Sequence, residues 1–152
     1  MSIDGFLYAG DSALDIVSRE VLIYFGHKLQ GNIYYSSAHA GISKSHSGNA
    51  ILAHLDEPQW LKEFHNYRNT VAHELLLANL CNITLDMYDS AGPKIIIPLP
   101  NDPRAKPDKR LYTRNPDVVK YTSDSFRRLL SHINQIYSSV CDGVDRKGTL
   151  PL

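Results

Sequence analysis

The chain has 152 residues, of which 43% are apolar, and its 16 lysines and arginines are balanced by 16 acidic residues. This length suits one globular domain with its own core, so we predict a single domain over residues 1–152. A net charge of zero excludes a general attraction for nucleic acid or an acidic membrane, and any anion-binding site must therefore be local.

The cysteines and the N-terminal residues bear on the compartment. Cys81 and Cys141 lack metal-ligand spacing and are too few for a disulfide framework. The N-terminal sequence lacks the basic and apolar regions of a signal peptide, and a run of about 18 apolar residues occurs nowhere. We therefore expect free thiols in a soluble, cytoplasmic protein.

Helical periodicity marks the first part of the chain. Residues 11–29 predict a helix in which Gly26 is an imperfection, and its apolar residues recur at spacings of three and four: Leu14, Val17, Val21 and Tyr24.

A polar, glycine-containing segment follows at residues 31–49 and favours a loop or a poorly formed helix before the short segment 50–55. Asp56 offers a side-chain oxygen as an N-cap, and Pro58 lies in the first turn after it. These residues predict a second long helix that runs to about Ile83.

Two β-prone runs at residues 85–98 flank Ala91-Gly92-Pro93 and predict a small β-hairpin inserted between helices. An irregular loop follows up to residue 114. It is either a solvated loop or an RNA-binding segment, and its basic side chains are Arg104, Lys106, Lys109, Arg110 and Arg114.

The last predicted helix begins with Asn115 as N-cap and Pro116 at its first position, and Gly143 ends it before a frayed tail at 144–152. Its apolar face comprises Val119, Phe126, Leu129, Ile133, Ile136 and Val140. The predicted fold class is all-α, an antiparallel helical bundle with the hairpin as an insertion.

Three polar residues interrupt the apolar face of the second long helix. At about 100° per residue, Asn69 and His73 lie one turn apart, whereas Arg68 lies about 140° around the axis and roughly 7.5 Å along it from His73. A guanidinium is long enough to meet the same phosphate as the imidazole. Asn69 would hydrogen-bond a ring nitrogen of His73 and so fix its tautomer.

The bare spacing of arginine and histidine is weak evidence, because about one such pair is expected by chance in this composition. Arg127 and His132 have the same spacing in the last predicted helix. Their helix offers no polar partner on the histidine's side, where the residue four positions earlier is Arg128.

The longer string Tyr67-Arg68-Asn69-Thr70-Val71-Ala72-His73 resembles the signature of the HEPN domain family. In that motif four to six residues separate arginine from histidine, and Asn, Asp or His often follows the arginine. Residues 6–21 and the run from PLPNDPR into the last helix are also similar to parts of HEPN proteins.

The resemblance implies an all-helical domain that acts as a metal-independent endoribonuclease, with no cofactor and with two copies of the motif meeting in a homodimer; other members are inactive. Toxin and antiviral roles are both open, and a toxin would imply an antitoxin partner. In some toxins a tyrosine two residues after the histidine is modified by a nucleotidyltransferase. Leu75 occupies that position here, which argues against this mode of neutralisation.

RNA cleavage without a metal needs a base for the 2′-hydroxyl, positive charge on the phosphorane and an acid for the 5′-oxygen. His73 would act as base or acid and Arg68 would stabilise the phosphoryl oxygens, with Asn69 beside them. A dimer supplies the second histidine. The expected products carry 2′,3′-cyclic phosphate and 5′-hydroxyl ends, and DNA would not be cut.

Further residues have weaker assignments. Asp11 and Asp15 would orient Arg68 through a charge-assisted hydrogen bond if their helix packs against the motif helix. His65 either lines the groove or is a bystander, and Tyr67 either stacks on a base or packs in the helix interface.

The alternative function is a non-catalytic HEPN module that binds nucleotide, RNA or protein, in which the Arg-Asn-His cluster is a binding site or a structural polar network. A metal site is not expected. His73-Glu74 begins like a zinc-protease helix, but Leu77 stands where the second histidine would be. Three further histidines lack metal spacing and are expected at the surface: His39, His46 and His54.

Overall fold

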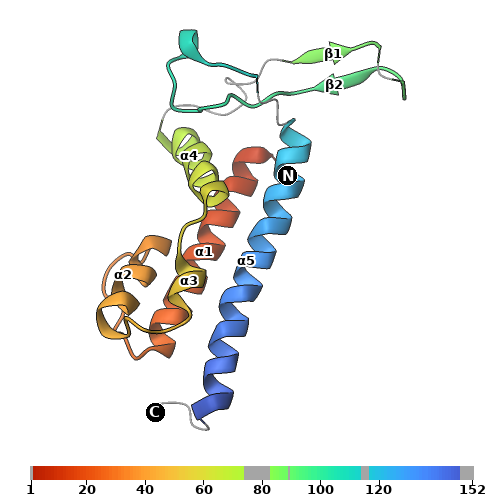
Figure 1. The fold of residues 1–152 in the computed structure, drawn as a ribbon. Helices are drawn as coiled ribbons and strands as arrows, with labels where there is room; N and C mark the ends of the chain where they lie inside the picture. Colours follow the sequence, from red (N-terminus) through yellow and green to blue (C-terminus); the bar gives the residue numbers. More distant parts are fainter. Residues whose placement is uncertain (1, 74–82, 89, 114–116, 148–152) are drawn as a thin grey trace. The chain divides into compact units, whose positions relative to one another are not determined.

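The computed structural model describes the backbone of residues 2–73, 83–88, 90–113 and 117–147 (Figure 1). Side chains are described for the same residues except 72, 73, 107 and 142–147. This part of the chain is mostly helical with one small antiparallel sheet, which confirms an all-α fold with a hairpin insertion. The elements are α1 (Ile3–Tyr24), α2 (Tyr35–Ser45), α3 (Leu52–Leu55), α4 (Gln59–His73), β1 (Thr84–Asp86), β2 (Lys94–Ile96), the 3-10 turn η2 (Pro107–Lys109) and α5 (Val118–Lys147).

Two compact units divide the chain. Unit 1 comprises residues 1–9 and 59–126, and unit 2 comprises residues 10–58 and 127–152. The long helices α1 and α5 contribute residues to both units.

The core of unit 1 is built on α4, whose apolar residues recur every third position. Leu61, Phe64 and Tyr67 are fully buried on one face of this helix. Phe6 of α1 packs edge to face on Phe64, with 5.8 Å between the ring centroids. The hydroxyl of Tyr67 donates a hydrogen bond to the carbonyl of Pro100, which fastens the segment after β2 to α4.

The predicted hairpin is confirmed. Leu85 of β1 lies opposite Ile95 of β2, and Gly92 in the connecting turn has a φ of +109°, which a residue with a side chain rarely adopts.

The start of α5 differs from the prediction, because the N-cap is Asp117. Its Oδ1 accepts hydrogen bonds from the backbone N–H groups of Val119 at 2.9 Å and Lys120 at 3.3 Å, and its Oδ2 accepts one from Ile97 at 3.1 Å. The helix therefore begins after Asp117, and the predicted cap residues Asn115 and Pro116 lie outside the described residues. One carboxylate thus joins the helix start to the end of the hairpin.

The last predicted helix also ends elsewhere and buries fewer residues than expected. Gly143 does not end α5, which continues to Lys147, so residues 144–147 of the predicted tail are helical and only 148–152 are undescribed. Leu129 and Ile136 are buried as predicted, whereas Val119 and Phe126 are 73% and 49% exposed.

The first helix begins at Ile3, earlier than predicted, and ends at Tyr24. Gly26 is therefore the residue that terminates the helix, not an imperfection within it. It has a φ of +74°, its N–H bonds the carbonyl of Ile23 at 2.9 Å, and the N–H of His27 bonds that of Leu22 at 3.0 Å. This left-handed glycine is the usual way to satisfy the last carbonyls of a helix.

Residues 35–45 were predicted as a loop or a poorly formed helix, but they form the regular helix α2 in unit 2. Tyr35, Ala38 and Ile42 are buried at helical spacing, so three side chains supply the packing that propensity did not predict. The carboxylate of Asp15 accepts a hydrogen bond at 2.9 Å from the N–H of Tyr35, an N–H that the first turn of a helix cannot satisfy itself.

Asp56 is not the N-cap of α4. It follows α3 as its C-cap, and its Oδ1 lies 3.1 Å from Nε2 of His39, while α4 begins at Gln59. Ile83 lies outside any helix, and residues 74–82, over which α4 was predicted to continue, lie outside the described residues.

Candidate functional site

The motif predicted to carry the chemistry lies on one continuous helix. Arg68, Asn69 and His73 all belong to α4, and His73 is its last residue. The side chain of His73 is outside the described part, so its distance from Arg68 stays a prediction.

Arg68 is held on two sides within unit 1. Its Nη1 donates a hydrogen bond to Oδ1 of Asn69 at 3.1 Å. Its Cζ lies 5.6 Å from the centroid of the Tyr8 ring, within the roughly 6 Å at which a cation interacts with an aromatic face. Arg68 is half-buried and Tyr8 is 42% exposed, so this contact lies at the surface of the unit.

Asn69 was predicted to bond the imidazole of His73. In the structure its side-chain oxygen accepts a hydrogen bond from the guanidinium of Arg68. The amide therefore acts on the cation, and its role toward the imidazole stays a prediction.

Tyr67 was expected either to stack on a base or to pack in a helix interface; it is 0% exposed, which agrees with packing and not with base stacking. Its ring lies 5.1 Å from that of Tyr121, and its hydroxyl bonds Pro100. A ring enclosed in this way has no face available for RNA.

The supporting residues fall in different places. Asp11 and Asp15 belong to unit 2, where Asp15 accepts from the backbone of Tyr35, and their predicted contact with Arg68 stays a prediction. His65 is half-buried on α4, with its ring centroid 6.2 Å from that of Phe64. It lies four residues before Asn69, on the same side of the helix.

The basic loop is closed at its base. The N–H of Asn101 bonds the carbonyl of Leu111 at 2.7 Å, and its side-chain amide donates to Thr113 Oγ1 at 2.8 Å. Arg104 Nε lies 3.4 Å from Asp102 Oδ1, so one of the predicted RNA contacts is already paired with a carboxylate. Lys106 and Lys109 are exposed and Arg110 is half-buried, while Arg114 lies outside the described residues.

The second arginine-histidine pair has the polar partner that its own helix lacks. His132 is 8% exposed, and its Nε2 lies 2.6 Å from the hydroxyl of Tyr35 on α2. Burial lowers the pKa of His132, and the neighbouring His54 lowers it further. This histidine is buried in the core of unit 2, so it lacks the solvent exposure that a general base needs to reach a substrate.

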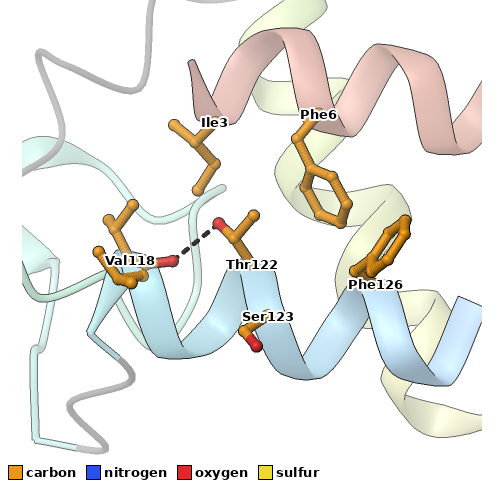
Figure 2. A pocket seen from close by; sticks show the side chains of 7 residues that line it. Ile3, Phe6, Val118, Thr122, Ser123 and Phe126 are labelled. Carbon is orange, nitrogen blue, oxygen red and sulfur yellow. Dashed lines mark hydrogen bonds between the residues drawn. The ribbon is translucent and has the colours of Figure 1, made fainter. Parts of the chain in front are cut away.

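An apolar groove of about 440 Å³ lies elsewhere in unit 1. Figure 2 shows Phe6 of α1 and Phe126 of α5 facing it, and Thr122 donates to the carbonyl of Val118 at 2.8 Å beside it. The lining residues are Ile3, Phe6, Val118, Val119, Thr122, Ser123 and Phe126. This lining suits an apolar group and not a phosphate.

Tyr8 is the candidate site residue that sequence reasoning missed. It lies in the segment that resembles HEPN proteins, but the periodicity of α1 gives no sign of a contact with a residue sixty positions later. Only the packing of α1 on α4 within unit 1 brings the two together.

Metal binding and membrane insertion are two other functions on which the described residues bear. Among them, no group of three or more His, Cys, Asp or Glu side chains is arranged to hold a metal ion. The described helices also include none with the length and apolar character needed to cross a membrane.

The chain was compared with family models, curated proteins and solved structures, and none of them matches it.

Proposed function

We propose that the protein is a metal-independent endoribonuclease of the HEPN type, with the antiparallel helical bundle of that family. The observation that carries the proposal is the motif helix α4, on which Arg68 contacts Asn69 and Tyr8 and lies about 1.4 turns before His73. A planar guanidinium fixed in this way suits the two-point binding of phosphate oxygens.

The proposed reaction is an in-line displacement. His73 of one copy removes the proton of the 2′-hydroxyl, whose oxygen attacks the adjacent phosphorus, while Arg68 stabilises the charge on the phosphoryl oxygens. The bond from phosphorus to the 5′-oxygen breaks, and His73 of a second copy gives that oxygen a proton. The products are a 2′,3′-cyclic phosphate and a 5′-hydroxyl, which need neither metal nor cofactor.

The test is cleavage of RNA by the purified protein in EDTA, with end groups identified by mass spectrometry and with a DNA of the same sequence as a negative substrate. We expect Arg68→Ala and His73→Ala each to lower the rate by about 10²-fold or more. Arg19→Ala, an exposed arginine of α1 to which we assign no role, is the matched control and should keep full activity.

Circular dichroism and sedimentation of each variant separate lost chemistry from lost folding or dimerisation. Cleavage that continues unchanged in folded Arg68→Ala and His73→Ala proteins would contradict the assigned roles. Cleavage that requires a divalent metal would contradict the mechanism.

The second candidate is a non-catalytic HEPN module that binds RNA, nucleotide or another protein. One observation favours a protein partner: Leu85 and Ile95, cross-strand neighbours in the hairpin, are 57% and 64% exposed and form an apolar sheet face. Absence of cleavage with every RNA tested, together with retained binding, would favour this module.

A further inference from the structure

Arg68 has a contact that comes from outside the motif, with Tyr8. The Tyr8 ring of α1 lies against the guanidinium at 5.6 Å, while Asn69 accepts from Nη1 at 3.1 Å. These two groups contact the cation in different ways: the guanidinium carbon lies over the Tyr8 ring, and the amide oxygen of Asn69 accepts a hydrogen bond from one N–H.

The difference matters because a guanidinium binds phosphate through its edge. Its five N–H donors lie in one plane, and an aromatic ring attracts the cation through its quadrupole, without an oxygen or nitrogen acceptor. A carboxylate in the same place would occupy two donors and neutralise the charge. A tyrosine ring carries no net charge, so it restrains the guanidinium without itself neutralising the cation.

Restraint of the Arg68 side chain before RNA binds lowers the entropic cost of binding. An arginine side chain loses rotamer entropy when it is fixed, and a partner that fixes it before substrate binds removes that cost from the binding step. In a site whose chemistry depends on alignment, displacement of a charged group by about 1 Å costs up to about 10²-fold in rate.

We propose that Tyr8 is a positioning residue that holds the guanidinium plane of Arg68 in the orientation needed for the scissile phosphate. This inference rests on the proposed nuclease function, because it names the residue that orients the cation of that same site. The aromatic ring carries the effect and the hydroxyl does not.

The test compares Tyr8→Phe, which keeps the ring, with Tyr8→Leu, which removes it. We expect Tyr8→Phe to stay within about twofold of the unaltered protein. Tyr8→Leu should lower kcat by threefold to thirtyfold and change KM for RNA by less, because a misaligned cation binds the substrate but fails at the transition state. Tyr34→Leu is the matched control, since Tyr34 is 56% exposed on the other unit, and it should change neither constant.

A spectroscopic measurement reads the contact without any reaction. Protons of the Arg68 side chain that lie over the Tyr8 ring should show an upfield ring-current shift in the NMR spectra of the unaltered protein and of Tyr8→Phe, and lose it in Tyr8→Leu. Absence of the shift in the unaltered protein overturns the inference whether or not RNA is cleaved.

A double-mutant comparison distinguishes positioning from general damage. Arg68→Lys keeps a charge but lacks the planar fork, so Tyr8→Leu should have a smaller effect on kcat in that background. An equal effect in both backgrounds, or full kcat in Tyr8→Leu beside an active unaltered enzyme, overturns the inference. Absence of cleavage by every form refutes the proposed nuclease instead, and the ring-current shift then still decides whether Tyr8 orients Arg68.

Discussion

Removal of the Tyr35 hydroxyl tests whether its hydrogen bond to His132 stabilises the core of unit 2. Tyr35 and His132 are 4% and 8% exposed, and 2.6 Å separates the tyrosine oxygen from Nε2 of the histidine. Tyr35→Phe keeps the buried ring but leaves the imidazole without this hydrogen bond. A buried polar group that loses its partner costs about 1 to 3 kcal/mol, so we expect the free energy of unfolding to fall by that amount.

Titration of His132 and of Tyr35 makes the stability of unit 2 depend on pH. Burial lowers the pKa of His132, with a further contribution from His54, so the folded state binds fewer protons than the unfolded chain just below pH about 6.5. Stability from this group is complete above that pH and is lost as pH falls toward the lowered native pKa. Burial raises the pKa of Tyr35, assisted by Glu57 and Asp56, so its contribution is complete below pH about 10 and is lost as pH rises above it.

The assay is urea unfolding followed by far-ultraviolet circular dichroism at pH 5, 7.5 and 10.5. Tyr35→Phe should be less stable at pH 7.5, and its loss of stability between pH 7.5 and 10.5 should be smaller, because phenylalanine does not titrate. Thermal unfolding is a second measurement, in which Tm should fall by about 2 to 4 °C for each kcal/mol. Tyr34→Phe, at an exposed position, is the matched control and should change the free energy of unfolding by less than about 0.5 kcal/mol. The reasoning is refuted if both variants have the same stability and the same pH profile.

Three further predictions follow from the fold and the loop. Asp117→Ala removes the acceptor of three backbone N–H groups and should cost about 1 to 2 kcal/mol at pH 7, as measured by thermal unfolding. Burial raises the pKa of Asp117, but those hydrogen bonds and Lys94 lower it more. This stability is therefore lost as pH falls below about 3.9, where the variant should differ little from the unaltered protein. An equal difference in stability at pH 7 and at the acidic pH would contradict the assignment. Gly26→Ala should lower the free energy of unfolding by about 1 kcal/mol, because φ at this position is +74°. Gly48→Ala is the control and should leave the free energy unchanged, because a side chain there meets open space and φ is not positive. Equal losses of stability would show that backbone strain is not the cause. Reversal of three loop charges should lower RNA affinity and reduce the slope of log affinity against log salt by about 2, and an unchanged slope would mean that the loop is only solvated. The charges to reverse are those of Arg104, Lys106 and Arg110.

Local chemistry in the sequence was sufficient for several elements. The turn residues at 91–93 placed the hairpin, because a glycine with positive φ between two β-prone runs leaves few alternatives. The apolar periodicity of α4 and α5 predicted two long helices, and the motif residues Arg68, Asn69 and His73 lie on a helix as expected. Each of these features is decided by residues close together in the chain.

Other features depended on residues far apart in sequence. The helix α2 exists because Tyr35, Ala38 and Ile42 are buried, and its polar sequence alone favours no such helix. The N-cap of α5 is Asp117 because its carboxylate also bonds Ile97, a constraint that a search for local capping residues cannot detect.

The sequence by itself determined the helical class, the hairpin and the identity of the polar residues on the motif helix, because spacing and turn chemistry act over a few residues. Tertiary structure alone decided which distant residues meet. Tyr8 lies against Arg68, Tyr67 is buried and bonds the carbonyl of Pro100, and Tyr35 is hydrogen-bonded to His132. The physical reason is that burial and hydrogen-bond partners depend on which distant surfaces pack together, and a single sequence does not encode those contacts as a local pattern.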